Sequence, residues 1–240
     1  MNIDIQLLPF SPDSFSLSKK TVVVIDVLRA TSVIVNAISQ EALEIIPVAT
    51  VEEAFQRGKD FPPGSVLLGG ERGSKKIGGF DLGNSPREYI AEKVKGKRLI
   101  LTTTNGTKAF HLVSSGREIL ATSFFNIGAI AHHCLDMRTD LLIFPSGDEG
   151  RFSLEDVVCG GMLIDHILKV AKGSVSLSDA SQSSLILYER FKENLVEVLR
   201  LSTHGQDLME RGFEEDLAYC AQVDITNVIP KFRDGVIRAR

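Results

Sequence analysis

Residues 21–32, TVVVIDVLRATS, decide the fold. The β-branched residues form an unbroken run without polar alternation, which predicts a strand over residues 21–27 that is covered on both faces. Asp26 stands at the end of this strand, and Thr31 is a residue type that begins helices. A buried strand that leads directly into a helix over residues 31–39 is the first half of a βαβ unit.

The same alternation of strand and helix continues through the first 145 residues or so. Apolar runs predict further strands at residues 3–8, 43–48, 66–68, 98–101, 118–120 and 140–144. Helices are predicted between them at residues 51–58, 85–94, 107–114 and 126–135. Strands that alternate with helices in this way form a largely parallel sheet with helices on both faces.

After Ser153 the sequence becomes helix-rich. Ser153 caps a helix whose apolar residues recur at helical spacing over residues 154–168, with Asp156 at the capping-box position. Further helices are predicted at residues 179–201, 206–210 and 214–220, before a closing strand at residues 225–229. We therefore expect an α/β fold, layered α/β/α with a largely parallel or mixed sheet and a helix-rich C-terminal part. It forms one compact domain over residues 1–240, with any subdivision near residues 145–180.

Composition narrows the function. The 240 residues are 43% hydrophobic and 24% charged, which excludes wholesale disorder. With 27 Lys+Arg against 31 Asp+Glu, the net charge of −4 argues against nucleic-acid binding. There is no membrane-length apolar run and no signal-peptide pattern, and the three cysteines are too scattered for a disulfide framework. We expect a cytoplasmic protein without membrane or nucleic-acid partners, and a homodimer on base rates.

Two polar clusters lie between a strand and the next helix, where the carboxyl ends of parallel strands line a ligand crevice. In the first, Asp26 suits a metal ligand or a nucleophile, while the simpler alternative is that it pairs with Arg29. In the second, TTTNGT at residues 102–107 offers hydroxyl, amide and backbone N–H donors to an anion. A threonine-rich helix cap explains the second cluster equally well.

A third cluster is the long loop GGERGSKKIGGFDLGNSPREY at residues 69–89, which contains six glycines. Loops of this length are usually functional or disordered. Glycines let backbone N–H groups turn towards a phosphate or sulfonate, and Arg72 and Lys75 supply positive charge. The loop matches no nucleotide-binding pattern, and its alternative is a solvated surface loop. Its position after a strand favours a function.

The fourth cluster is acidic. Asp148, Glu149, Glu155 and Asp156 lie within nine residues and flank Arg151. Crowded carboxylates repel one another unless a cation neutralises them, and Mg²⁺ prefers oxygen ligands. A favourable helix dipole explains Glu155 and Asp156 but not all four acids, so a divalent cation is the better interpretation. His204, in STHG, could act as an acid, although a surface turn is the simpler reading.

Taken together, DVLRATS, GERGSKKIGGFDLGNSPREY, TTTNGT, GDEGRFSLEDVVCGG and the later STHG…GFEEDLAYC resemble the 2-phosphosulfolactate phosphatase family. The motifs occur in the same order from about residue 3 to residue 230. The resemblance implies a Mg²⁺-dependent phosphatase that hydrolyses 2-phospho-3-sulfolactate to 3-sulfolactate and phosphate, which in some organisms is a step of coenzyme M biosynthesis. One departure is Ser74, which stands where many members carry glycine.

The resemblance also implies roles for these residues toward a small anionic phosphoester. The catalytic set is Asp26, Arg29, Glu155 and Asp156. The substrate-binding set is Arg72, Lys75, Thr103, Thr104, Asn105, Gly106 and Arg151. The Mg²⁺ ligands are drawn from Asp26, Glu71, Asp148 and Glu149.

Two mechanisms and two other functions stay open. Attack by a metal-activated water is favoured over an aspartyl-phosphate at Asp26, because Leu28 replaces the second aspartate of haloacid-dehalogenase-type enzymes. An isochorismatase-like hydrolase would use Cys159 as its nucleophile. A non-catalytic binder of anionic metabolites would need the anion-binding loops but not the crowded acids.

Overall fold

The computed structural model describes residues 1–239, which contain one mixed sheet of eleven strands in the order β5-β4-β6-β3-β11-β10-β7-β2-β8-β1-β9. The strands are β1 (Asn2–Ile5), β2 (Thr21–Ile25), β3 (Glu44–Pro47), β4 (Val66–Arg72), β5 (Lys75–Lys76), β6 (Arg98–Thr102), β7 (Glu118–Thr122), β8 (Leu141–Pro145), β9 (Ser176–Leu177), β10 (Pro230–Arg233) and β11 (Val236–Ala239). The α-helices are α1 (Ser14–Leu17), α2 (Ala30–Ser39), α3 (Val51–Gly58), α4 (Ala91–Val94), α5 (Gly106–Leu112), α6 (Ile127–Met137), α7 (Leu154–Val170), α8 (Asp179–Phe191), α9 (Leu195–Leu201), α10 (Thr203–Glu210) and α11 (Glu214–Cys220). Two short 3₁₀ helices are η1 (Pro86–Glu88) and η2 (Phe124–Asn126).

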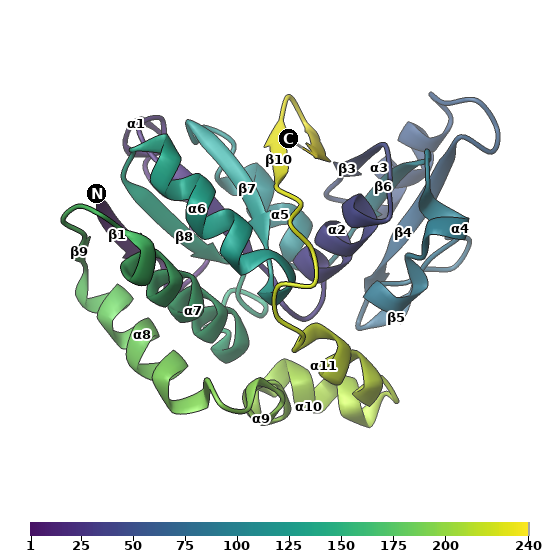
Figure 1. Ribbon diagram of the computed structural model, residues 1–240. Coiled ribbons are helices and arrows are strands. Elements are labelled where there is room, and N and C mark those ends of the chain that lie inside the picture. Colours follow the sequence, from purple (N-terminus) through teal and green to yellow (C-terminus); the bar gives the residue numbers. More distant parts are fainter. Residues whose placement is uncertain (240) are drawn as a thin grey trace.

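The sheet consists of two blocks of parallel strands. One block is β7-β2-β8-β1-β9 and the other is β4-β6-β3, with the short β5 antiparallel to β4. The hairpin β10–β11 lies between the blocks and pairs antiparallel with β7 on one side and with β3 on the other (Figure 1). The predicted α/β class with a mostly parallel, mixed sheet and a helix-rich C-terminal part is therefore confirmed.

Helices α2 and α5 lie between the two blocks and pack against both (Figure 1). Their core contains Ile34 of α2 and Phe110 of α5. It also contains Val24 of β2 and Leu99 of β6, one strand from each block. Every residue of α2 from Ala30 to Ile38 is buried, which is the property of a helix covered on all sides. Each block is therefore covered by helices on both faces, and α2 and α5 cover the inner face of both blocks.

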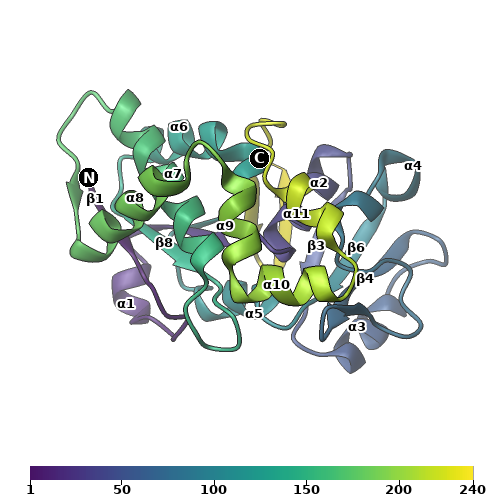
Figure 2. The ribbon, with the colours of Figure 1, turned by 90° about the horizontal axis from the view of Figure 1, so that it is seen from below.

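The outer faces carry the remaining helices. Helices α6, α7 and α8 cover the first block, and α3 covers the second. From α8 the chain continues through α9, α10 and α11 and reaches η1 beside the second block (Figures 1 and 2). The C-terminal helices therefore span both halves of the molecule. None of the helices within residues 1–239 has the length and apolar composition that a bilayer crossing requires.

The predicted element boundaries fail where local polar groups end a helix or make a turn. The helix expected at residues 179–201 is two helices, because the side chain of Asn194 accepts the backbone N–H of Glu197 and starts α9 afresh. The helix expected at residues 85–94 divides into η1 and α4. The closing strand lies at Pro230–Arg233 rather than at residues 225–229, and it forms a hairpin through the left-handed pair Asp234-Gly235.

Substitution of Phe232 tests the hairpin that joins the blocks. This side chain of β10 is buried, and its ring centre lies 5.5 Å from that of Phe110. We expect Phe232→Ala to lower the free energy of unfolding by about 3–5 kcal/mol, because it leaves a cavity between the two blocks. Urea unfolding measures this, with Phe10→Ala as the control because Phe10 is 62% exposed. Equal losses in the two variants would contradict a structural role for the hairpin.

Candidate active site

A cavity of about 500 Å³ opens where the ends of four strands meet. Its lining includes Asp26 after β2, Glu71 at the end of β4, Thr103 after β6 and Asp148 after β8. The two blocks of the sheet therefore direct their carboxyl ends to one place. The opposite wall comes from α10, whose residues Thr203, His204, Asp207 and Arg211 complete the lining.

Asp26 stands between the N-termini of two helices. Its Oδ1 accepts the N–H of Ala30 at 3.0 Å, at the start of α2. Gly106, the first residue of α5, approaches from the other side: a Cβ there would lie 2.5 Å from Asp26 Oδ2 and 2.4 Å from Ala30 Cβ. Only glycine fits in this contact, so the close approach of α5 to the carboxylate explains a glycine at this position.

Glu71 connects two of the predicted loops. Its Oε1 accepts the N–H of Thr104 at 2.8 Å, and its Oε2 accepts the N–H of Ser74 at 2.9 Å. Arg72 adds a second connection, since its guanidinium donates to the Glu71 carbonyl and to the hydroxyl of Thr102. Both oxygens of Glu71 accept backbone N–H groups, so this side chain links the glycine loop to the threonine-rich loop.

The threonine-rich loop is fixed from both sides. Thr103 Oγ1 accepts the N–H of Thr107 at 3.1 Å, which satisfies a free N–H of α5. Asn105 Oδ1 accepts the N–H of Glu149 at 3.2 Å and so joins this loop to the acidic segment. Thr103, Thr104 and Asn105 all line the cavity, as the sequence analysis expects of anion-binding residues.

The four acids of the acidic segment separate into two pairs. Asp148 and Glu149 lie at the rim with Arg151, whose nitrogen is 3.9 and 3.7 Å from their carboxylate oxygens. Glu155 and Asp156 are buried in the first turn of α7. The crowding predicted from the sequence therefore occurs between this inner pair and Asp26, rather than among the four acids of the segment.

Asp156 is held beside Asp26 by the segment that follows β2. Its Oδ1 accepts the N–H of Val27 at 2.8 Å, and its Oδ2 accepts the hydroxyl of Ser146 at 3.4 Å. The helix cap predicted at Ser153 is confirmed, because the Ser153 hydroxyl accepts the N–H of Asp156. The capped end of α7 thus carries its acids into the interior.

Burial governs the ionisation of the inner acids. It raises the pKa of Asp26, Glu155 and Asp156 above the ordinary range of a carboxyl group. The Ala30 N–H and the charge of His204 offset part of the effect at Asp26. The pKa of Asp156 is raised well above its usual value, since the charges of Glu155 and Asp26 add to the effect of burial.

The donor chemistry of these acids fits Mg²⁺, although no group of three or more His, Cys, Asp or Glu side chains in residues 1–239 is arranged to hold a metal ion by itself. Mg²⁺ is usually held by one or two carboxylates together with water and phosphate oxygens. Buried carboxyl groups whose neighbours discourage ionisation are also the groups that a bound cation would neutralise. These residues therefore fit a Mg²⁺ site in which the protein supplies a few carboxylate ligands and the substrate supplies the rest.

Some cavity residues carried no predicted role, and four predicted residues, Lys75, Gly106, Glu155 and Asp156, are not part of the cavity lining. Lys75 is exposed on β5 and does not line the cavity. Asn84, Ser74, Asp207 and Arg211 line it without having been given a role, and His204 lies in α10 and lines the cavity rather than occupying a surface turn. The spacing of residues 203, 204, 207 and 211 along α10 is the signal that could have identified this polar face.

The cavity contains both carboxylates, which bind cations, and arginines, which bind anions. This combination complements the charges of a phosphate ester and its metal ion. In an α/β fold whose strand ends open on that cavity, this chemistry defines the class of the protein as a phosphoric monoester hydrolase.

Comparison with known proteins specifies the family. The family model described as 2-phosphosulpholactate phosphatase matches residues 10–235. A "Probable 2-phosphosulfolactate phosphatase" of Caldanaerobacter subterraneus subsp. tengcongensis is 41% identical over 92% of this chain and 91% of its own length. Proteins with the same description from Clostridium tetani and Thermotoga petrophila are 38% and 39% identical, over 99% and 98% of this chain and 100% and 96% of their own lengths. The chain belongs to the 2-phosphosulfolactate phosphatase family, as its motifs predicted.

Titration of the buried acids predicts how stability depends on pH. A raised pKa means that the folded state keeps protons that the unfolded state releases, so the free energy of unfolding falls as the pH rises above the ordinary pKa of a carboxyl group, about 4. Asp156→Asn removes the acid whose pKa is raised well above the ordinary value and keeps an oxygen for the Val27 N–H. We expect this variant to be more stable than the parent near neutral pH and to show a flatter pH dependence.

Urea unfolding in EDTA at several pH values measures both effects. The exposed Glu52→Gln is the matched control, because it removes one carboxylate from the surface of α3. If the free energy of unfolding of the parent protein rises steadily over this pH range, the prediction is wrong, because burial then does not disfavour ionisation of the inner acids.

Proposed function

We propose that this chain is a Mg²⁺-dependent phosphatase that hydrolyses 2-phospho-3-sulfolactate to 3-sulfolactate and phosphate. The observation that supports it best is the cavity itself, which places the carboxylate of Asp26 beside the guanidinium of Arg29, with the acids Glu155 and Asp156 buried behind its wall. A substrate with a phosphate, a sulfonate and a carboxylate needs several cationic partners, and the descriptions of the relatives name this substrate.

The arginines and the loop donors account for anion binding in this proposal. Arg29 and Arg72 line the inner wall and Arg151 the rim, so an anion in the cavity has guanidinium groups on more than one side. Guanidinium groups bind phosphate and sulfonate oxygens with two parallel hydrogen bonds. The backbone N–H groups of Asn105 and Gly106 stand at the start of α5, where N–H groups favour negative charge, whereas the N–H of Thr104 already donates to Glu71.

The metal would be held by few protein ligands. Asp26 is the first of them in this proposal, because it is central among the strand ends and only its Oδ1 accepts a backbone N–H of the described chain. Asp148 and Glu149 can reach the same cavity from the rim. Glu71 contributes as a brace, since the N–H groups of Ser74 and Thr104 already occupy both of its oxygens. When bound, Mg²⁺ supplies positive charge that stabilises the negative phosphoryl oxygens in the transition state.

Glu155 lines a smaller pocket that shares Asp148, Thr203 and His204 with the cavity, and we propose that Glu155 and its neighbour Asp156 supply the proton for the leaving alkoxide. Burial raises their pKa, so a proton is available on the pair at the pH at which a free carboxyl group would have lost it. After the proton has left, the same carboxylate can accept a proton from the attacking water. His204 stands near enough to influence the charge of both Asp26 and Glu155.

A covalent route through Asp26 is the second candidate for the mechanism. It is favoured by the position of Asp26 at a strand end, in the cavity and beside the N-terminus of α5. Acid quenching during turnover followed by mass spectrometry distinguishes the routes. A phosphorylated peptide that contains Asp26 supports the covalent route, and its absence during steady turnover supports attack by water.

Phosphate release tests the function directly. We expect release from 2-phosphosulfolactate to require Mg²⁺ and to stop in EDTA, since the inner acids lack a cation without it. Asp26→Asn and Glu155→Gln should each lower kcat/KM about 100- to 1000-fold, because the first removes the proposed metal ligand in the cavity and the second removes a proposed proton donor beside it. Glu52→Gln, on the exposed face of α3, is the control with the same change of charge. Metal-independent turnover, or no turnover by folded wild-type protein, would contradict the proposal.

Cys159 separates this proposal from a cysteine hydrolase. Burial raises the pKa of its thiol well above the ordinary value, and the side chain is fully buried within the apolar core that α7 forms with the first block. We expect Cys159→Ala to keep kcat/KM within about twofold while lowering stability by roughly 1 kcal/mol through a smaller core side chain. Complete loss of activity in a folded variant would instead favour the isochorismatase-like hydrolase.

A further inference from the structure

We propose that Asp216, in the C-terminal helix α11, is a positioning residue for the reaction because it holds Arg29 in the orientation that binds the substrate anion. The inference rests on the proposed function to the extent that it takes Arg29 to contact the substrate. It assigns the late helices α10 and α11 to the active site, although they lie far along the chain from the motif that contains Arg29.

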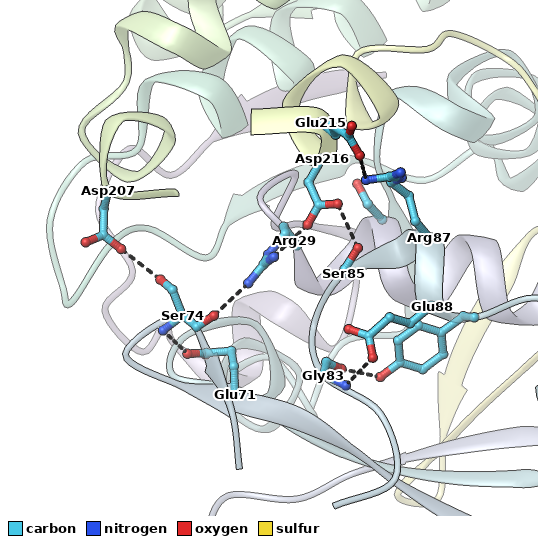
Figure 3. A network of polar contacts seen from close by, with 12 residues as sticks. Arg29, Glu71, Ser74, Gly83, Ser85, Arg87, Glu88, Asp207, Glu215 and Asp216 are labelled. Carbon is cyan, nitrogen blue, oxygen red and sulfur yellow. Dashed lines mark hydrogen bonds and ion pairs between the residues drawn. The ribbon is translucent and has the colours of Figure 1, made fainter. Parts of the chain in front are cut away.

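The contact between the two side chains is short and dry. Arg29 Nη1 lies 2.6 Å from Asp216 Oδ2, and the two side chains are 1% and 2% exposed. A buried guanidinium is costly unless a carboxylate compensates its charge. Asp216 provides this compensation within the part of the chain that the structure describes, and Figure 3 shows it reaching Arg29 from α11.

Further contacts fix the guanidinium plane. Nη2 donates to the Ser74 carbonyl at 3.1 Å, and the ring of Phe213 lies 4.3 Å from the Arg29 Cζ atom. Ser74 is itself held by Glu71, through its N–H, and by Asp207, whose carboxylate accepts its hydroxyl at 2.8 Å (Figure 3). The guanidinium is therefore enclosed by the glycine loop on one side and by the C-terminal helices on the other.

Asp216 is held as firmly as the group that it positions. Its second oxygen, Oδ1, accepts the hydroxyl of Ser85 at 2.7 Å (Figure 3). Ser85 precedes η1, so the carboxylate is bound to the second block of the sheet as well as to α11. With both oxygens engaged, Asp216 has little freedom to rotate, and it transmits that rigidity to Arg29.

One donor of Arg29 is left for a ligand. Arg29 lines the cavity, and its Nε atom has no hydrogen-bond partner in residues 1–239. Asn84, another lining residue, is more than nine-tenths buried and also has an unpartnered atom, Oδ1. Buried polar atoms without partners in a cavity mark positions where a ligand or water completes the hydrogen bonds. We assign the Nε edge of the guanidinium, which neither Asp216 nor Ser74 contacts, to a substrate oxyanion that would complete its hydrogen bonds on binding.

Variants of two neighbouring acids on α11 separate positioning from general support. Asp216→Asn keeps the shape but removes the charge opposite Arg29. Glu215→Gln is the matched control, because Glu215 forms an ion pair with Arg87 of η1 at 2.5 Å, and these side chains are 76% and 46% exposed. Both changes weaken a contact between α11 and η1, and only the first touches Arg29. Kinetics with 2-phosphosulfolactate and binding of inorganic phosphate by calorimetry are measured for each.

We expect Asp216→Asn to lower kcat/KM about 10- to 100-fold, mainly in kcat, and to weaken phosphate binding. Glu215→Gln should stay within about twofold of the parent. In the double variant Arg29→Lys/Asp216→Asn, the loss should be no greater than in Arg29→Lys alone, since Asp216 acts through Arg29. Ser85→Ala, which leaves the ion pair in place, should give a smaller loss with the same lack of additivity, and it serves if Asp216→Asn does not fold.

Three results would overturn the inference. The first is that Asp216→Asn has the same kinetic constants as Glu215→Gln, and the second is that the losses in kcat/KM multiply in the double variant. The third is that Ser85→Ala and Asp216→Asn fold and bind phosphate as tightly as the parent. Failure of the proposed function is a different result, in which wild-type protein binds inorganic phosphate but does not hydrolyse the ester. In that case the phosphate affinities of the same variants decide the inference.

Discussion

Charge that is buried at one end of a sheet is the constraint on which the rest of this structure depends. Asp26 lines the cavity together with the buried guanidinium of Arg29, and Glu155 and Asp156 are buried behind the cavity wall. Removing such groups from water is unfavourable unless hydrogen bonds or opposite charges replace the solvent. The surrounding loops supply these partners: the Ala30 N–H for Asp26, the Val27 N–H for Asp156 and the carboxylate of Asp216 for Arg29.

The hydrogen bonds and the ion pair compensate the buried charges only in part, and this makes the site suitable for a charged ligand. The acids are stabilised by backbone donors but keep a raised pKa, so they favour either a proton or a cation. Arg29 is neutralised by Asp216 yet keeps an unpartnered Nε. A fully satisfied cluster would be inert, whereas this one would gain favourable contacts from the metal ion and the anionic ester that we propose as its ligands.

The bent sheet explains how such different loops come together. Helices α2 and α5 serve as the common middle layer, so the strand ends of the two blocks converge on one cavity beside the N-termini of both helices (Figure 1). The C-terminal chain then contributes twice, with the hairpin β10–β11 between the blocks and with α10 and α11 across the cavity.

Local sequence determined a great deal of this protein. The unbroken apolar run before Asp26, the Ser153 cap and the helix at Val51–Gly58 are encoded by neighbouring residues, and the ordered motifs identified the family. The Asn194 cap and the Asp234-Gly235 turn are also local signals, although they were overlooked in favour of longer periodic patterns. The strand-end rule likewise predicted that Asp26, Thr103 and Asp148 would share one crevice.

Only the tertiary structure decided which charges meet. Nothing in the sequence separates the exposed Glu149 from the buried Asp156, because burial depends on which strand packs over the start of α7. Asp216 and Arg29 are 187 positions apart, and they come into contact because the C-terminal helices cross from one block to the other. Local patterns specify the elements and the kind of chemistry at their ends. Long-range packing sets the desolvation and the pairing of each charge, because both depend on neighbours that are remote in the chain.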